Sequence, residues 1–272
     1  MQKKVEKDVV FPFWEGIIFP FETIYKKVKD FCCLIGVFSL IAAVLVMAFG
    51  RSFACALGLN GWGIYCMVNP WGMLLLFVLL LFLMACFVNR WWMIAFKGMG
   101  FAEVIKIKPD TKDIKVLGFL LVYLVIFLIV GGGLYLLYSR TATPDLKLEL
   151  AIFVGVSLVI VMSLVLLLNA VVFARFLEGE EWFVIRQTLL PLFDNIYKIV
   201  AWFLFYLLFF AYLMRQAGSL FFVLQRELPL FISSFLSEFA LQFVFYLVAA
   251  CVVSLLKLQA DCIFKDRKST DK

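Results

Sequence analysis

The sequence predicts an all-α polytopic membrane protein with about six transmembrane helices, arranged as three helical hairpins that each follow an amphipathic helix at the inner face. Three observations lead to this fold class. Hydrophobic residues make up 65% of the 272-residue chain, well above the roughly 45–50% of soluble domains. Five long segments and a shorter sixth contain no Asp, Glu, Lys, Arg or His. Basic residues alternate between abundant and scarce in successive connections.

A helix needs about 20 apolar residues to cross about 30 Å of hydrocarbon. We therefore expect spans near residues 31–50, 70–89, 116–138, 150–174, 199–214 and 239–256. The fifth is the shortest because its apolar run ends before Arg215, and helix tilt or local bilayer thinning would accommodate it. The connections are too short for a domain that folds in water, so residues 1–272 are expected to form a single membrane domain.

The basic residues predict the orientation. With six spans, most of the 25 Lys and Arg residues fall on the side of the two termini. The other side holds Arg51, Arg140, Lys147, Arg215 and Arg226. Because short basic loops stay cytoplasmic, we expect a multi-pass protein of the inner (cell) membrane with both N- and C-termini cytoplasmic. The net charge of +6 then reflects attraction to anionic lipid head groups at the inner face, rather than a nucleic-acid partner.

Three connecting segments are expected to lie in the inner interface, near residues 11–30, 90–115 and 175–198. The first and third share a pattern, which reads Phe21-Glu22-Thr23-Ile24-Tyr25-Lys26 in one and Phe193-Asp194-Asn195-Ile196-Tyr197-Lys198 in the other. The apolar members of each fall on one helical face, and Pro20 and Pro191 precede them as at a helix start. The pattern predicts amphipathic interfacial helices in an internal, parallel repeat. A chance match is the alternative.

Tryptophans lie near the ends of predicted spans. Trp71 opens the second span, Trp91 and Trp92 close it, and Trp202 lies near the start of the fifth. We interpret them as interfacial anchors, since tryptophan is enriched where the membrane meets water. A ligand-binding aromatic box is the alternative interpretation.

Two cysteines, Cys55 and Cys66, lie in the first outer connection. On an oxidising side of the membrane they would form a disulfide that contributes about 3 kcal/mol in the chain-entropy model. The other cysteines are expected to act as small apolar side chains. With no CxxC pair and no His, we expect no metal site and no cofactor.

Asn169 in the fourth span and Gln242 in the sixth are the side-chain amides within the predicted spans. We expect them to make intramembrane hydrogen bonds between helices rather than to line a pore. The run Gly131-Gly132-Gly133 in the third span favours close helix packing, with a broken transport helix as the alternative. Glu227 and Glu238 are expected to be boundary residues near the sixth span.

Catalysis finds little support in the sequence. The chain has no His, so a Ser–His or Cys–His nucleophile system cannot form within it. The acidic run with Glu178, Glu180 and Glu181 lies beside Arg175 and Arg186, which is typical of a solvated, charge-balanced turn. We therefore expect no enzymatic activity, and a lipid-modifying enzyme at these carboxylates ranks third among the function classes.

The leading hypothesis is a non-enzymatic scaffold or accessory subunit that acts through its lipid-facing and partner-facing surfaces. Its partners would be membrane lipids and either another membrane protein or a second copy of the chain. The alternative is a small permease or channel for a neutral or lipid-like substrate, which needs no buried charge. A mid-membrane cavity lined by Asn169 and Gln242 would favour transport, and a sealed apolar core would favour the scaffold.

Overall fold

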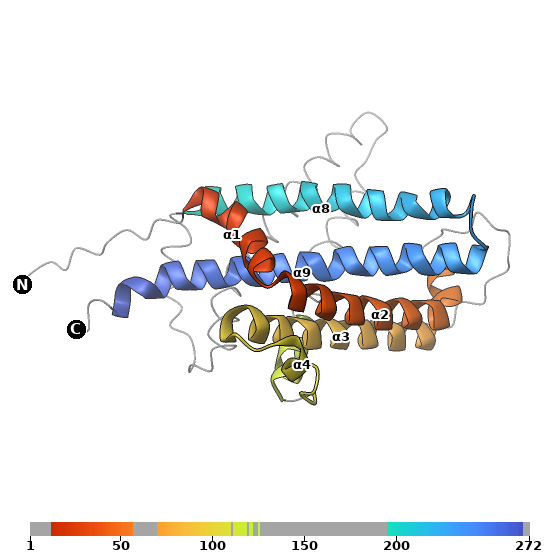
Figure 1. Cartoon of the computed structure of the whole chain (residues 1–272), viewed down its shortest axis with the longest axis horizontal. Helices are drawn as coiled ribbons and strands as arrows, with labels where there is room; N and C mark the ends of the chain where they lie inside the picture. Colours follow the sequence, from red (N-terminus) through yellow and green to blue (C-terminus); the bar gives the residue numbers. More distant parts are fainter. Residues whose placement is uncertain are drawn as a thin grey trace, which may run out of the picture. The chain divides into compact units, whose positions relative to one another are not determined.

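A computed structural model describes residues 12–56, 70–109, 111–118, 120, 121, 125 and 195–268. These residues are largely helical, and no β-strand occurs among them. The helices are α1 (Phe13–Lys26), α2 (Val28–Ala56), α3 (Pro70–Lys97), α4 (Phe101–Val104), α8 (Ile196–Leu224) and α9 (Leu230–Lys268) (Figure 1). A further helical stretch covers residues 111–118.

The chain divides into two compact units, each described here by itself. Unit 1 comprises Met1–Glu22, Phe119–Leu207 and Val252–Lys272, and unit 2 comprises Thr23–Gly118 and Leu208–Cys251. Unit 2 therefore contains α2, α3 and α4 whole. Helices α1, α8 and α9 each contribute residues to both units.

Four helices in the described part of the chain are long and apolar enough to cross a membrane. The qualifying stretches are Val28–Phe49 in α2, Leu74–Lys97 in α3, Tyr197–Leu224 in α8 and Leu230–Cys262 in α9. They coincide with the spans predicted near 31–50, 70–89, 199–214 and 239–256, so the prediction of a helical fold with several helices able to cross a membrane is confirmed. The span predicted near 150–174 and most of that near 116–138 lie outside the described residues, and the six-span hairpin arrangement stays a prediction.

Helices α8 and α9 extend well beyond their predicted apolar spans. Helix α8 continues through Arg215 to Leu224, and α9 runs for 39 residues. Arg and Lys are good helix formers, so a charged residue ends an apolar run without ending the helix. At 1.5 Å per residue α9 is about 58 Å long, nearly twice the thickness of bilayer hydrocarbon. Part of α9 must therefore lie outside any bilayer that it crosses.

A five-residue turn joins α8 to α9. The Leu228 N–H donates to the Leu224 carbonyl at 2.9 Å, and Pro229 directly precedes the first residue of α9. Proline disfavours helical geometry in the residue before it, which separates the two helices here. The Ser233 N–H then donates to the Pro229 carbonyl at 3.0 Å and closes the first turn of α9.

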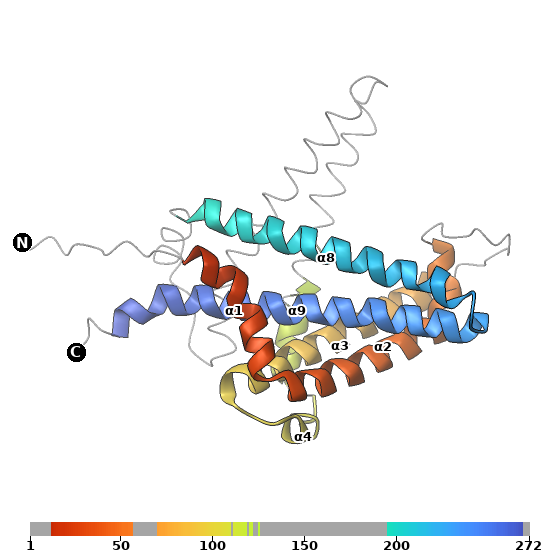
Figure 2. The same ribbon diagram turned by 45° about the horizontal axis from the view of Figure 1, so that its top comes forward.

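Aromatic side chains fill the junction of α2, α3 and α9 in unit 2. The rings of Phe38, Phe87 and Tyr246 lie in mutual contact, with centroids 4.8–5.9 Å apart. A second contact joins Phe31 to Trp91 at 4.9 Å in an edge-on geometry. Such aromatic pairs stabilise a core beyond the area that they bury. In Figures 1 and 2, α2 lies beside α3 along this junction.

Residues 85–94 of α3 are buried on all faces of the helix. Every residue from Ala85 to Ile94 is at most 9% exposed. The helix ends where Gly98 adopts φ of +72°, a left-handed conformation that glycine adopts without steric cost. The Met99 N–H donates back to the Met93 carbonyl at 3.2 Å. Residues 90–94, predicted within the interfacial segment 90–115, are thus in the buried part of a long helix, and Lys97 at its end is exposed.

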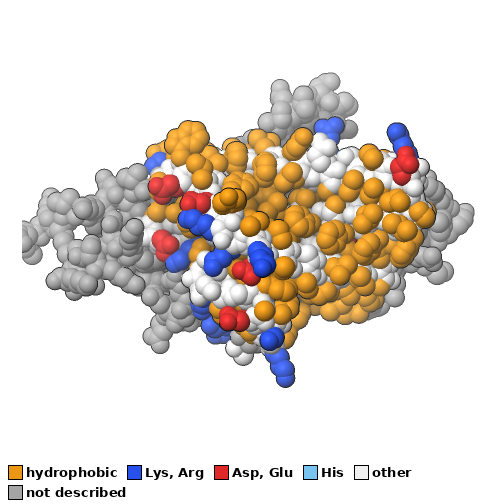
Figure 3. Space-filling view, in the orientation of Figure 1, with side chains coloured by type: hydrophobic (Ala, Val, Ile, Leu, Met, Phe, Trp, Pro, Cys, Tyr) orange, Lys and Arg blue, Asp and Glu red, His pale blue; other side chains and the backbone are white. Residues whose placement is uncertain are grey.

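The outward side of unit 2 is apolar along its long helices. Large hydrophobic side chains are exposed at Leu40, Ile41 and Val44 on α2 and at Leu74, Leu75, Phe77 and Val78 on α3. Figure 3 shows hydrophobic side chains spread over the surface of α2, while charged side chains gather around its first turn and around α4. A contiguous apolar surface of this kind is solvated favourably by lipid and unfavourably by water.

Candidate functional site

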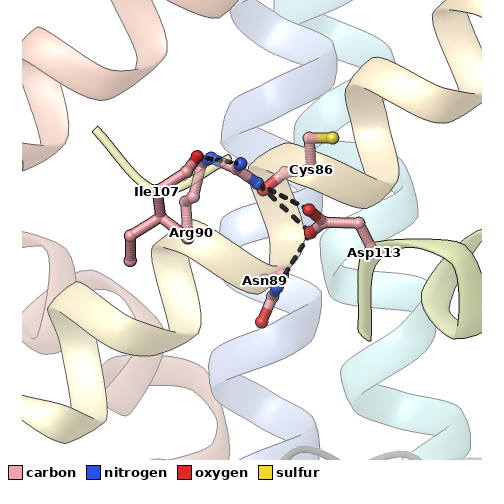
Figure 4. A network of polar contacts seen from close by, with 5 residues as sticks. All are labelled: Cys86, Asn89, Arg90, Ile107 and Asp113. Atoms are coloured by element: carbon pink, nitrogen blue, oxygen red, sulfur yellow. Dashed lines mark hydrogen bonds and ion pairs between the residues drawn. The ribbon is translucent and has the colours of Figure 1, made fainter. Parts of the chain in front are cut away.

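A buried network of charged and polar groups lies beside the end of α3. The Arg90 guanidinium nitrogen Nη1 lies 3.1 and 3.2 Å from the two carboxylate oxygens of Asp113. The Asn89 amide donates a further hydrogen bond of 2.8 Å to the same carboxylate. The Asp113 side chain is 0% exposed and that of Arg90 is 5% exposed. Figure 4 shows the Arg90 and Asn89 side chains converging on the Asp113 carboxylate.

Backbone carbonyls complete the coordination of Arg90. Its Nη1 donates to the Cys86 carbonyl at 3.1 Å, and its Nη2 donates to the Ile107 carbonyl at 2.9 Å (Figure 4). Both terminal nitrogens of the guanidinium are therefore used by acceptors of the protein itself. A buried ion pair is tolerated only when its remaining donors and acceptors are also satisfied, and this one meets that condition.

The network holds a return segment, defined as residues 98–118, against the long helices. Ile107 and Asp113 both belong to this segment, and the side chains of Val104 and Val116 are 0% exposed. A second tether comes from α2, where Asp30 Oδ1 accepts the Phe101 N–H at 3.0 Å. Asp30 and Arg90 thus fix the return segment from two helices, close to the point where α3 ends.

Exposed lysines occupy the outward side of these same elements. Lys29 in the first turn of α2, Lys97 at the end of α3, and Lys106 and Lys108 of the return segment are exposed. We refer to these four residues as the basic surface. Glu103 is also exposed, and its carboxylate accepts the Gly100 N–H at 3.2 Å. Figure 3 shows Lys and Arg side chains interspersed with a few acidic ones around α4 and the start of α2.

In unit 1, a second set of contacts joins α1 to α8. The Trp202 indole N–H donates to the Phe13 carbonyl at 2.7 Å. The Tyr206 hydroxyl lies 2.9 Å from the carbonyl oxygens of both Gly16 and Ile17. Pro20 lies inside α1 and has no N–H, so the Gly16 carbonyl lacks its usual helical donor. Tyr206 supplies a donor to that position.

Gly16 is required at this contact for a steric reason. A Cβ atom built on Gly16 would overlap the indole ring of Trp202. The ring therefore lies directly against the α1 backbone, and the Trp202 side chain is only 1% exposed. This close approach makes the α1–α8 contact specific, since every other residue type would displace the indole.

The interpretation of the tryptophans as interfacial anchors needs correction for three of them. Trp91, Trp92 and Trp202 are 0%, 1% and 1% exposed, so none of these rings faces lipid or water. The Trp91 N–H donates to the Ala250 carbonyl of α9 at 3.3 Å. A position near the end of a predicted span suits a tryptophan at the membrane interface and a tryptophan buried between helices equally well, because the indole N–H finds an acceptor in either place. The side chain of Trp71 lies outside the described residues.

Of the predicted polar and disulfide residues, Gln242 and Cys55 belong to helices in the described part of the chain. Gln242 donates to the Glu238 carboxylate at 2.7 Å, one turn earlier on the same helix. Asn169, Cys66, the glycine run at 131–133 and the acidic run at 178–181 lie outside the described residues. Cys55 falls in the last turn of α2, and its predicted disulfide with Cys66 stays a prediction.

The segments with matching sequence share burial but differ in helix position. Thr23 and Asn195 are both buried, at 8% and 4%, while Tyr25 and Tyr197 are both exposed, at 79% and 65%. Helix α1 ends at Lys26, however, and α8 begins at Ile196. The matching residues thus close one helix and open another, and only residues 195–198 of the second segment are described.

The sequence analysis missed the Arg90 network altogether. Arg90 and Asp113 both fall in the segment near residues 90–115, which was predicted to lie in the inner interface. One signal was available, because Asn89 and Arg90 follow an apolar run directly and are themselves followed by Trp91-Trp92-Met93-Ile94. Polar residues between apolar stretches of a single helix indicate buried groups that require a partner.

The described residues form a helical protein with four helices long and apolar enough to cross a membrane and with a buried ion pair between Arg90 and Asp113. Among the described residues, no group of three or more His, Cys, Asp or Glu side chains lies close enough to hold a metal ion. No protein-family model, curated protein or solved structure matches this chain. We therefore base its function on the geometry of the described residues.

Proposed function

We propose that the chain is a non-enzymatic multi-pass protein of the inner membrane that acts as a scaffold or accessory subunit through its lipid-facing and partner-facing surfaces. The observation that carries this proposal is the Arg90–Asp113 pair, which is buried and fully engaged by groups of the protein itself. A transported ion or a catalytic proton would need to reach such a charge from water. Here both partners stabilise the return segment instead.

The packing of the helix junction supports the same role. Phe38, Phe87 and Tyr246 interlock where α2, α3 and α9 meet, and these three side chains are at most 5% exposed. Interiors packed in this way transmit force and hold a fixed shape. A rigid bundle with an apolar exterior suits a protein whose activity lies in presenting its surfaces.

Helix α8 is the strongest candidate for a partner-facing surface. Of the four candidate spans it buries the smallest share of its residues. Leu208, Tyr212, Phe222 and Val223 are each at least 61% exposed. We propose that lipid or another membrane protein, including a second copy of the chain, covers this face in the membrane.

The proposed topology has six spans in three hairpins, each preceded by an interfacial helix, with both termini in the cytoplasm. It is supported by the distribution of basic residues along the sequence and by the burial shared between Thr23 and Asn195. Green fluorescent protein fused after Lys272 should fluoresce, and alkaline phosphatase at the same place should be inactive. The opposite pair of results would refute the cytoplasmic C-terminus.

The alternative is a permease or channel for a neutral or lipid-like substrate. One observation favours it, because Glu238 and Gln242 form a partly buried polar pair within the apolar stretch Leu230–Cys262. Polar groups inside a membrane-spanning helix often mark the route of a substrate. The pair also has a structural explanation, since an i,i+4 hydrogen bond on one helix satisfies both side chains.

Flux through liposomes separates the two functions. The purified protein, reconstituted alone, should release no more of an encapsulated neutral solute, and flip no more labelled lipid, than protein-free liposomes do. If the unchanged protein releases more solute than protein-free liposomes do, and the Gln242→Leu variant does not, the permease is established and the scaffold role is overturned. Gly36→Ala on α2 is the matched control, because a methyl group there meets no neighbouring atom within 4 Å.

A further inference from the structure

Two segments that are distant in sequence form one basic surface in unit 2. Lys29 lies beside Asp30, whose carboxylate binds the Phe101 N–H of α4 at 3.0 Å. Lys106 and Lys108 flank Ile107, whose carbonyl accepts a hydrogen bond from Arg90 of α3 at 2.9 Å. These tethers bring lysines of α2 and of the return segment to the same end of the α2–α3 pair.

Three described acidic residues near these lysines accept internal hydrogen bonds. Asp113 is fully buried against Arg90 and Asn89, and the Asp30 carboxylate accepts the Phe101 N–H. The exposed Glu103 carboxylate accepts the Gly100 N–H at the start of α4. The Asp113 charge is balanced by Arg90, while Asp30 and Glu103 keep their negative charges and are outnumbered by the four exposed lysines of the basic surface.

Apolar side chains are exposed among the lysines. Ile105 is 40% exposed beside Lys106, and Ile114 is 62% exposed on the helical stretch 111–118. Tyr25 is 79% exposed at the end of α1. Lysine with interspersed aliphatic and aromatic residues is the composition that binds a lipid interface, where apolar groups enter the acyl boundary and ammonium groups meet phosphates.

We propose that the basic surface, formed by Lys29, Lys97, Lys106 and Lys108, binds the head groups of anionic phospholipids. The ligand is a lipid because the same elements continue directly into the apolar helices α2 and α3, which places the lysines at the edge of a hydrocarbon layer. The Arg90–Asp113 pair serves as the positioning element, since it holds the return segment with its lysines outward. This inference deepens the proposed function by assigning a ligand to one lipid-facing surface.

Native mass spectrometry of the full chain in detergent, titrated with phosphatidylglycerol or phosphatidylcholine, tests the proposal. The unchanged protein should bind phosphatidylglycerol more tightly than phosphatidylcholine. A basic residue near anionic lipid contributes a factor of about five in affinity, so Lys106→Gln with Lys108→Gln should weaken phosphatidylglycerol binding about 25-fold. Lys106→Arg with Lys108→Arg should bind as the unchanged protein does, because the charges are kept.

The control removes two charges from another element of the same unit. Arg215 and Arg226 are exposed residues of α8 and of the turn that follows it, and replacing both by Gln should change phosphatidylglycerol binding less than twofold. Equal binding of the two lipids by the unchanged protein, or an unaltered affinity in the Lys106→Gln/Lys108→Gln variant, would overturn the proposal. Equal loss in the Arg215→Gln/Arg226→Gln control would also overturn it, since the effect would then follow net charge alone.

A measurement on the unchanged protein covers the case in which the lysine variant fails to fold. Raising the ionic strength from about 0.1 M to about 1 M shortens the screening length from about 10 Å to about 3 Å. Phosphatidylglycerol binding should weaken, and unaltered binding would count against a surface made of exposed lysines. Solute flux does not depend on this result, so the lipid site and the scaffold role can fail independently.

Discussion

The hydroxyl of Tyr206 lies 2.9 Å from the carbonyl oxygen of Gly16, the acceptor that Pro20 leaves without a helical donor. A proline inside a helix normally exposes that carbonyl or kinks the helix. Here a residue of α8 donates in place of the missing N–H. The carbonyl that Pro20 leaves without a donor in α1 is therefore the group that Tyr206 of α8 binds.

Replacing Tyr206 by Phe should destabilise the protein by about 1–3 kcal/mol, because a buried carbonyl loses its donor while the ring is kept. The measurement is the midpoint of thermal unfolding of the detergent-solubilised protein. Tyr212→Phe is the control, since this side chain is 61% exposed on the same helix. An equal, small effect of both substitutions would show that the Tyr206 hydroxyl does not stabilise α1.

Gly16→Ala should also destabilise the protein, because the new methyl group overlaps the Trp202 indole. Overpacking of this kind costs about 1–3 kcal/mol. Gly36→Ala is the matched control in a helix with open space around the glycine, where alanine should be neutral or stabilising by up to about 1 kcal/mol. Similar unfolding midpoints for the two variants would contradict the close contact.

Asp113→Asn should be the most destabilising single change, at about 3–5 kcal/mol, because it leaves the buried Arg90 charge uncompensated. The control is Asp261→Asn, which breaks the Lys257–Asp261 pair of 2.6 Å at a side chain that is 50% exposed. An exposed i,i+4 pair contributes less than about 1 kcal/mol. Equal losses of unfolding free energy in the two variants, measured by denaturant titration, would contradict the expectation that the buried pair contributes more than the exposed one.

A double substitution tests whether the Arg90–Asp113 pair contributes to the free energy of unfolding or instead holds the return segment in place. Replacing Arg90 by Met and Asp113 by Leu removes both charges and should restore most of the stability lost in Asp113→Asn, as apolar replacements of buried pairs often do. The return segment would lose its tether to Arg90 at Ile107, so proteolysis at Lys106 and Lys108 should increase. Unchanged proteolysis would show that the network does not hold this segment.

Asp30→Ala should loosen the start of α4, since the Phe101 N–H loses its acceptor. Hydrogen bonds to charged groups contribute about 1.5–3 kcal/mol, so amide exchange in peptides covering 98–109 should accelerate at least about tenfold. Hydrogen–deuterium exchange followed by mass spectrometry measures this change. Glu103→Gln keeps an acceptor for Gly100 and should leave exchange at Phe101 unchanged, and acceleration in both variants would contradict a specific tether.

Hydrophobic runs were sufficient to locate the long helices but not their ends. Each predicted span that falls in the described residues overlaps a helix, because an uncharged stretch of about 20 residues has few other stable structures. The ends depend on local backbone geometry and on helix propensity. Gly98 ends α3 through its positive φ, and α8 passes Arg215 because a charge does not interrupt backbone hydrogen bonds.

Burial of individual residues was the least predictable property. Arg90 and Asp113 lie in the segment 90–115 that was predicted to be interfacial, and Trp91, Trp92 and Trp202 were expected at the interface. Three of them bind partners that are distant along the chain: Arg90 binds Asp113, Trp91 binds the Ala250 carbonyl, and Trp202 binds the Phe13 carbonyl. Periodicity within one helix cannot identify a partner 23 or 159 residues away.

The sequence by itself determined that this is a helical protein with several helices long and apolar enough to cross a membrane, because apolar content and run length depend only on composition and order. It also determined where lysine is abundant. Only the tertiary structure decided which charges are neutralised inside and which face outward, because that depends on contacts between distant segments. The ion pair between Arg90 and Asp113 and the hydrogen bond from Tyr206 to Gly16 both depend on such contacts.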